Sequence, residues 1–455
     1  MAFTCCRVST VALAGRDYEH RSQTLFVIRL PSYPNSSQKG ITFLLAESIT
    51  APNVPQLSDN PHLLDTAHWE GNFVVIHTLA THVGVNLNSD RDGLPKRITV
   101  GGTTRMRLSA YSRVRAARTY ARTFTEGTDQ ATARSRLLPK KIAKYLADRY
   151  DLDAKKAEAL AVYIVHAAGM GIVPSRPDLT SAVTYLPETA VARLGQLVWD
   201  VQGEHAEAIE ETQRTIAAHQ GAALEEKKVK KKDLPSLPKV PKRLADASRA
   251  RFAPGVCAEI ALFGRMLTEI PDGQVFSAVQ VAHAIGVDEI EMINDFYIVK
   301  DDYQDLGVFG GAILGDMFLA SGTVYSYAAL DRRMLRTTLT GGFPDPEERE
   351  HVARWAEQLF VTAISYSVPG GKRSRTGPAM LPTLIVAATT DHPLTAAPAF
   401  EEAITGPAGA EASRRLGGYL SAAQSRAPLH QGKALCLPPL EADALLMPSV
   451  IALDA

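Results

Sequence analysis

The sequence has 455 residues, 45% of them hydrophobic and 22% charged, which is typical of a globular protein with two or three hydrophobic cores. Its 49 Lys and Arg residues balance its 49 Asp and Glu residues, so no overall positive charge marks a nucleic-acid binder. The four cysteines form no CxxC pair and the twelve histidines show no metal-ligand spacing. We therefore expect no disulfide framework, no metal or other cofactor, and a reducing cytoplasm. No apolar run approaches the roughly 20 residues that span a bilayer, so we expect no membrane association.

Residues 1–72 carry little periodicity and are rich in Pro, Ser and Asn. Five prolines interrupt any long helix or strand in this stretch. We interpret it as an appended, partly disordered N-terminal extension, and an upstream choice of start codon would explain it equally well. Arg7 and the apolar stretch after it faintly resemble a signal peptide, but the stretch is too short for secretion to be the preferred interpretation.

The first strong strand pattern is FVVIHTLA over residues 73–80, which is β-branched and apolar. A second strand over 103–109 alternates Arg105 and Arg107 with apolar residues, which predicts that both arginines lie on the same face. Ser109 stands where a helix N-cap would, and residues 110–123 are predicted to be helical. One face of this helix carries Val114, Ala117 and Ala121, and another carries Arg115, Arg118 and Arg122.

From about 135 to 225 the pattern is helical and alanine-rich, and the basic, proline-containing stretch 227–243 is predicted to be a linker. We interpret the charges of this linker as solvated rather than as a specific binding site. The apolar density of CAEIALFGRM (257–266) predicts a strand, and SAVQVAHAIG (277–286) is predicted to form a short helix that ends at Gly286.

Residues 287–317 form a glycine-containing insertion ahead of a predicted strand over 318–330. An amphipathic helix over 346–365 and a strand over 381–388 follow, separated by the basic glycine loop VPGGKRSRTGP (368–378). The buried stripe of the helix should consist of Val352, Ala356, Leu359, Phe360 and Ala363. The element order predicts an α+β fold with a split βαβ, RRM-like (ferredoxin-like) sheet and insertions, although the aromatic RNP motif of the standard RRM is absent.

Charge is unevenly distributed along the chain. Residues 91–144 hold fourteen Lys and Arg against three acidic residues, a net +11, which predicts a phosphate-binding surface unless the charges form a solvated helix face. The loop 368–378 adds three cations among glycines that let the backbone approach a phosphate. The insertion 287–317 carries eight acidic residues against one lysine, a net −7. Its aromatic residues, Phe296 and Tyr297 among them, could stack on bases or form the core of the hairpin itself.

Four segments, in this order, resemble the CasC family, the backbone subunits of type I-E CRISPR Cascade complexes. They are GGTTRMRLSAYSRVRAAR (101–118), IALFGRM (260–266), AVQVAHAI (278–285) with SGTVYSYA (321–328), and VPGGKR (368–373). The resemblance runs from about Phe73 to about Phe400. It implies an RRM-like palm in three parts (73–123, 251–286 and 318–455, the last with the C-terminal segment), a helical fingers domain (124–250) and a β-hairpin thumb (287–317).

By position, the resemblance implies which residues contact RNA. The RNA backbone would be held by Arg105, Arg107, Ser109 and Arg115, with Arg118 extending the surface. Met266 would lie at a kinked nucleotide, Phe296 and Tyr297 would be the aromatic pair of the thumb, and Lys372, Arg373 and Arg375 would lie on the phosphate-gripping loop. The sequence departs from the family at Tyr111, where Gln is usual, and at Val114, where Lys is usual. Arg113 is the candidate to replace that lysine.

The resemblance implies a non-enzymatic scaffold that polymerises head to tail along crRNA with other Cascade subunits. It would present the guide for pairing with a target DNA strand in antiviral defence. No residue pattern in the sequence demands catalysis. Two alternatives stay open: Asp295, or Asp301 with Asp302, could bind Mg²⁺ and cleave RNA as thumb aspartates of type III backbone subunits do, or the chain could be a stand-alone RNA-binding protein.

Overall fold

The computed structural model describes residues 66, 68–224, 234–252, 257–267, 269–270, 273–299, 313–437 and 447–454. Most of the predicted extension (residues 1–65 and 67) and the middle of the predicted thumb (residues 300–312) lie outside the described residues.

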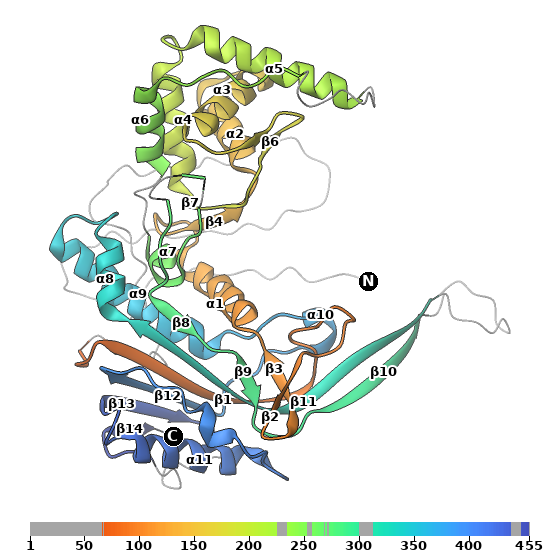
Figure 1. The fold of residues 1–455 in the computed structure, drawn as a ribbon, viewed down its shortest axis with the longest axis vertical. Coiled ribbons are helices and arrows are strands. Elements are labelled where there is room, and N and C mark those ends of the chain that lie inside the picture. The colour runs from red at the N-terminus through yellow and green to blue at the C-terminus, as the bar shows by residue number, and fades with distance from the viewer. Residues whose placement is uncertain are drawn as a thin grey trace, which may run out of the picture. The chain divides into compact units, whose positions relative to one another are not determined.

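One large sheet organises this part of the chain (Figure 1). Along its main path the strand order is β14-β13-β12-β1-β11-β9-β3-β2, and β8 and β10 also pair with β11. The strands are β1 (Phe73–Val85), β2 (Arg97–Val100), β3 (Thr103–Leu108), β8 (Val279–Val281), β9 (Ala284–Gly286), β10 (Glu291–Val299), β11 (Ile313–Asp331), β12 (Leu384–Thr390), β13 (Leu429–Cys436) and β14 (Ile451–Asp454). The predicted mixed α+β class is confirmed, and the finer RRM-like assignment stays a prediction.

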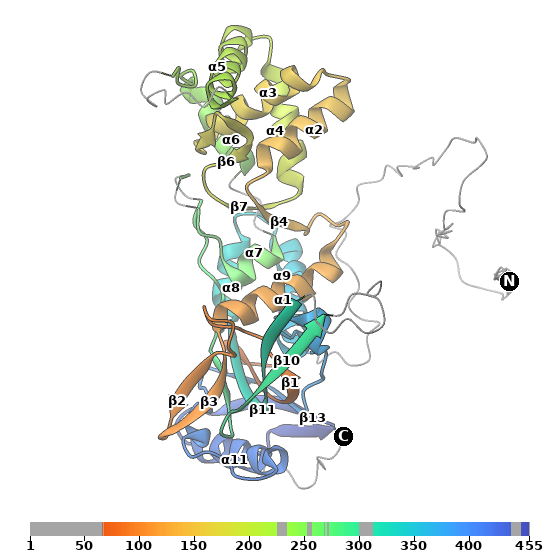
Figure 2. The ribbon, with the colours of Figure 1, turned by 90° about the vertical axis from the view of Figure 1, so that its right-hand side faces the viewer.

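Helices cover both faces of this sheet (Figures 1 and 2). One face is covered by α1 (Ala110–Thr125), α7 (Ala258–Phe263), α8 (Arg332–Leu339) and α9 (Pro346–Tyr366), and the other by α11 (Ala408–Ala423). Strand β1 contributes to both cores, because Val74 and Ile76 pack on the α9 side while Val75 and Leu79 pack on the α11 side. Burial on both faces explains why its sequence is a continuous apolar run.

The chain between α1 and α7 builds a separate hydrophobic core. Its helices are α2 (Leu138–Tyr150), α3 (Ala154–Ala167), α4 (Thr189–Val201), α5 (Ala206–Leu224) and α6 (Lys242–Phe252). Side chains such as Ile142, Leu160 and Leu194 are fully buried among them. The helical pattern is confirmed, but it missed two small sheets, β4 (Thr132–Ser135) with β7 (Thr184–Pro187) and β5 (Ile172–Val173) with β6 (Arg176–Thr180).

Local sequence signals explain where helices α1 and α9 begin. Ser109 is the N-cap of α1, and its Oγ accepts a hydrogen bond from the amide of Ser112. Asp345 caps α9 in the same way through the amide of Glu348, and Pro346 occupies the first turn. All five residues of the predicted apolar stripe of α9 are fully buried, so both helix predictions are confirmed.

Two short predicted elements are wrong. Residues 258–263 form helix α7 rather than a strand, since a six-residue apolar run fits both periodicities, and the helix ends at Gly264 with φ +74°. The predicted helix over 277–286 is instead two strands, β8 and β9. Both pair with the edge of β11, as in Val279 with Leu330, so tertiary hydrogen bonding overrides the local alanine-rich pattern.

Residues just before β1 pack against the large sheet and its helices. Thr66 is fully buried, and its carbonyl and those of Trp69 and Gly71 accept hydrogen bonds from the Arg332 guanidinium. Arg332 in turn forms a buried ion pair with Glu357 on α9. The described core therefore includes Thr66, which lies within the predicted N-terminal extension (residues 1–72).

Strand β10 and residues 313–321 of β11 pair to form an arm that extends away from the sheet (Figure 1). The register runs from Glu291 opposite Ser321 to Val299 opposite Ile313. The rest of β11 then continues as a central strand beside β1. The described strands pair in antiparallel fashion across the segment predicted as a thumb (287–317) and up to residue 321, and the thumb assignment stays a prediction.

Candidate nucleic-acid interface

The predicted RNA-contacting residues separate into buried and exposed groups. Arg105 belongs to the first, and its side chain is completely buried. Its guanidinium donates hydrogen bonds to the carbonyls of Val100, Gly286, Val287, Phe400 and Glu401 over 2.9–3.3 Å. These acceptors lie at the end of β2, at the base of the arm and beside the short 3₁₀ helix η3 (Ala397–Phe400). Arg105 holds these three segments together, and it has no face open to a phosphate in this structure.

Arg118 is also occupied by the protein itself. It forms a 2.9 Å ion pair with the fully buried Glu259 of α7, and its guanidinium lies 4.1 Å from the centroid of the Tyr185 ring. The hydroxyl of Thr132 donates a hydrogen bond to the second oxygen of Glu259. Burial alone would lower the pKa of Arg118, but Tyr185 and Glu259 raise that pKa above its ordinary value. This cluster ties α1 to α7 and to the small sheet of β4 and β7.

Ser109 and Arg107 stand at the junction of β3 and α1. Ser109 is buried, its amide donates to Asn88, and its hydroxyl caps the helix. Arg107 is half-buried, and its Nε has no hydrogen-bond partner among the described residues. The expectation of one shared face for Arg105 and Arg107 is therefore only partly met, since the first is fully buried and the second is not.

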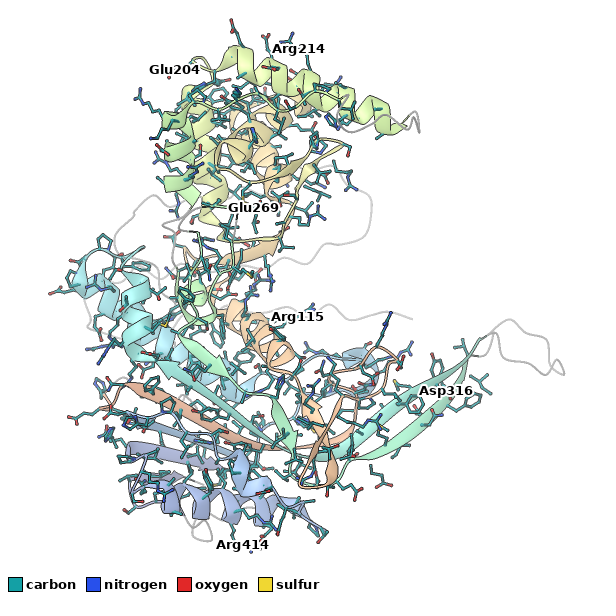
Figure 3. All side chains as sticks on the ribbon, viewed as in Figure 1. Arg115, Glu204, Arg214, Glu269, Asp316 and Arg414 are labelled. Atoms are coloured by element: carbon teal, nitrogen blue, oxygen red, sulfur yellow. The ribbon has the colours of Figure 1, made fainter. Side chains whose placement is uncertain are left out.

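Four of the predicted cations are exposed. Arg115 lies on the open side of α1 (Figure 3), and Lys372, Arg373 and Arg375 lie on the basic loop (residues 368–378), which contains the short helix α10 (Arg373–Thr376). Gly371 has no side chain, which lets this loop pack closely against the backbone just after β1. A Cβ at this position would lie only 2.5 Å from the carbonyl oxygens of Asn86 and Leu87. These four side chains form no ion pair within the described part of the chain.

The arm carries the predicted aromatic pair on opposite faces, as the alternation of a strand requires. Phe296 is 57% exposed. Tyr297 lies across Gly315 of the partner strand, and the guanidinium carbon of Arg375 is 5.3 Å from its ring centroid. The basic loop and the arm are therefore in direct contact through Arg375 and Tyr297. Only Phe296 presents a ring that is free to stack on a base.

Met266 is 81% exposed on the turn after α7. The preceding Arg265 is buried, with a hydrogen bond from its Nε to the carbonyl of Gly273, and its backbone pairs with Val275. The turn is thus fixed while the methionine side chain projects from it, as a contact with a displaced base would need.

Arg113, the candidate to replace the usual lysine of the family, is buried, and it donates hydrogen bonds to the carbonyls of Ala282 and Tyr327. A signal was present, because Arg113 precedes the buried Ala117 and Ala121 by one and two helical turns. Val114 and Tyr111, the other departures, are half-buried and 88% exposed, respectively.

Within the part of the chain that the structure describes, no group of three or more His, Cys, Asp or Glu side chains is arranged to hold a metal ion. None of the helices in this part combines the length and the apolar character needed to cross a membrane. Asp295 is exposed on β10, and Asp301 and Asp302 lie outside the described residues.

Comparisons with known proteins agree on one relationship. The family model of CT1975-like proteins matches residues 74–430. One chain of a solved "CRISPR RNA-guided surveillance complex, pre-nicking" is 28% identical with a TM-score of 0.65, and one of a "CRISPR RNA-guided surveillance complex" is 26% identical with a TM-score of 0.56. Each match covers 82% of this chain and 95% of the other. No curated protein sequence matches the chain. Because the family model spans most of the sequence, the chain belongs to the CT1975-like protein family.

Proposed function

We propose that this chain is the backbone subunit of a CRISPR RNA-guided surveillance complex of the Cascade type I-E class. Several copies would line up along one crRNA together with the other subunits. The protein would hold the RNA backbone while the bases stay available to pair with a target DNA strand. Such a role needs no catalytic residue, and we propose that the protein is not an enzyme.

This proposal rests on exposed arginines and lysines that have no acidic partner among the described residues. Arg115 on α1 and Lys372 and Arg373 on the basic loop are exposed and have no acidic partner among the described residues. Some arginines elsewhere, such as Arg336 and Arg414, pair with glutamates. Unpaired cations are the groups that release counterions when they meet phosphates.

Two apolar side chains, one on the arm and one on the turn after α7, support the proposal that the bases are held available for pairing. Phe296 and Met266 are both exposed apolar side chains that could fill the space beside a base displaced from the stack. The acidic insertion would avoid the phosphates of its own RNA segment and approach the basic surface of the next subunit. Contacts of this head-to-tail kind propagate along a filament rather than close into a dimer.

The test is the salt dependence of RNA binding. A triple variant, Arg115→Ala, Lys372→Ala and Arg373→Ala, should bind every RNA sequence more weakly. Its slope of log K against log salt should fall by about 2, at roughly 0.7 per lost contact with a single strand. The matched control changes three exposed arginines outside the interface, Arg333, Arg354 and Arg414, and should keep the wild-type slope.

Two results would count against the proposal. If both triple variants lost the same slope, binding would depend on net charge rather than on this surface. If the loss depended on RNA sequence, the side chains would be reading bases rather than gripping the backbone. Native mass spectrometry of the protein with a long guide RNA should show several copies per RNA, and a single copy would refute polymerisation.

A further inference from the structure

A polar cavity lies beneath the surface between the sheet and the C-terminal end of α9. It has a volume of about 40 Å³. Thr78 and His82 of β1, Ser326 of β11 and Ser365 of α9 line it, together with Arg113 of α1. Val368 and Pro369, the first residues of the basic loop, also line it. The cavity therefore borders the start of the basic loop, and none of the four exposed cations lines it.

Arg113 brings a charge into this cavity that nothing in the described protein neutralises. Only 7% of its surface is exposed. Its Nη1 donates to the carbonyl oxygens of Ala282 at 2.7 Å and Tyr327 at 2.9 Å, while its Nε and Nη2 have no partner among the described residues. Burial lowers the pKa of Arg113 to about 10, so the side chain is still a cation at neutral pH.

Two other buried arginines have a counter-ion, because Arg118 and Arg332 each meet a buried glutamate. Arg105, like Arg113, donates only to carbonyls, but it has five such acceptors whereas Arg113 has two. A buried cation without a counter-ion is strongly unfavourable, which is why such groups are nearly always paired. Arg113 thus has neither the carboxylate of Arg118 and Arg332 nor the larger set of carbonyls around Arg105.

Two more polar groups at the cavity have no partner. Nδ1 of His82 and Oγ of Ser365 are both buried without a hydrogen bond, and the two residues are 3% and 4% exposed. Buried polar atoms of this kind normally bond to protein, water or a ligand. A hydroxyl and an imidazole beside a guanidinium provide the hydrogen-bond donors that an oxyanion requires.

We propose that this cavity binds a phosphate group, with Arg113 as its counter-charge and Ser365 and His82 as hydrogen-bond donors. The volume of about 40 Å³ corresponds to roughly three water molecules, so the cavity is large enough for a small polar group. The same chemistry suits inorganic phosphate and a non-bridging pair of oxygens on an RNA backbone that passes over the basic loop. The RNA source rests on the proposed function, whereas the anion site itself does not.

The experiment measures the melting temperature of the full chain as sodium chloride is replaced by sodium phosphate at constant ionic strength. Wild type should gain a saturable few degrees. Arg113→Gln should lose the gain, and Arg414→Gln, an exposed arginine on α11 (Figure 3), should keep it. Ser365→Ala is a second test variant in case Arg113→Gln folds poorly. Because the Ser365 hydroxyl has no hydrogen-bond partner among the described residues, this variant should melt like wild type in chloride. Its melting temperature should rise less than that of wild type in phosphate.

Adding a short RNA identifies the source of the phosphate. If RNA at saturation abolishes the phosphate-dependent gain, and Arg113→Gln lowers the salt slope of RNA binding by about 0.7, the site takes a backbone phosphate. If RNA and phosphate stabilise the protein independently, the site takes the free anion. A wild type that gains nothing in phosphate, or Arg113→Gln and Ser365→Ala variants that gain as much as wild type, would overturn the site and leave a water-filled cavity. RNA binding by wild type in the same series tests the proposed function separately.

Discussion

Arg105 provides a sharp test of the interface, because the family resemblance and the structure give it different roles. The resemblance implies a contact with the RNA backbone, whereas the structure buries the side chain among five carbonyl acceptors. Arg105→Ala would remove a donor from each of them, although the Val287 oxygen would keep the amide of Ile404 as a donor. At the lower figure of about 1 kcal/mol for each buried group left unsatisfied, the loss is up to about 4 kcal/mol. Many domains have a total stability of only about 5–15 kcal/mol, so this variant should lie near the unfolding threshold.

The assay therefore includes the milder Arg105→Lys, which keeps the charge but cannot reach all five carbonyls. Urea unfolding should show a clear loss of unfolding free energy, and RNA binding well below the transition should keep the wild-type salt slope. The exposed Arg115→Ala is the opposite case: its unfolding free energy should change by about 0.5 kcal/mol or less, and its slope should fall by about 0.7. An Arg105→Ala protein with unchanged urea midpoint and a reduced slope would refute the reasoning from burial.

Acid should weaken the fold through two buried histidines, because burial lowers the pKa of His77 to about 3 and that of His82 to about 4. The unfolded chain then binds more protons below pH 6.5, so the unfolding free energy should fall by up to about 1.4 kcal/mol per pH unit for each histidine between pH 6.5 and 4. Urea midpoints from pH 7 to 5 measure this, and a His82→Gln variant with the wild-type pH slope would contradict it. Deleting residues 1–65 should leave the urea midpoint unchanged, whereas deleting 1–72 should lower it, because Arg332 loses three carbonyl acceptors. Equal midpoints would show that the segment before β1 contributes nothing. Incubated with RNA and Mg²⁺, the assembled protein should leave the RNA intact, and periodic cuts that vanish in Asp295→Asn would establish a ribonuclease instead. Target-DNA affinity across a full set of single mismatches should show regularly spaced tolerated positions that weaken in Met266→Ala with Phe296→Ala, and a smooth wild-type profile would argue against the arm assignment.

Long elements of the fold could be predicted from sequence, and short ones could not. Helix α9 shows five apolar residues at helical spacing after an Asp-Pro start. Strands β1 and β11 contain apolar and β-branched runs that favour a strand over a helix. Helix α7 and strands β8 and β9 are three to six residues long. At that length the periodicity of the sequence does not distinguish a helix from a strand. For β8 and β9, hydrogen bonding to β11 determines the structure.

The candidate site shows a different limit. The residue types were predictable, since arginines, glycines and an aromatic pair appear where the family resemblance puts them. Their exposure was not, because it depends on partners far away in sequence: Glu259 for Arg118, and Phe400 and Glu401 for Arg105. Tyr297 likewise meets Arg375, a contact that no local pattern indicates.

The partners of the arginines, more than their number, therefore determine how much RNA the protein can neutralise. The segment 91–144 has a net charge of +11, which would suggest a very steep salt dependence. Within it, Arg105 donates hydrogen bonds to backbone carbonyls and Arg118 forms an ion pair with Glu259. Arg113 lines a cavity rather than the surface. We expect these three cations to stabilise the fold or to bind a single buried phosphate, and not to add to the exposed cations on α1 and the basic loop. The salt slope per subunit should accordingly be much smaller than the charge count implies, with the basic loop supplying a large share of it.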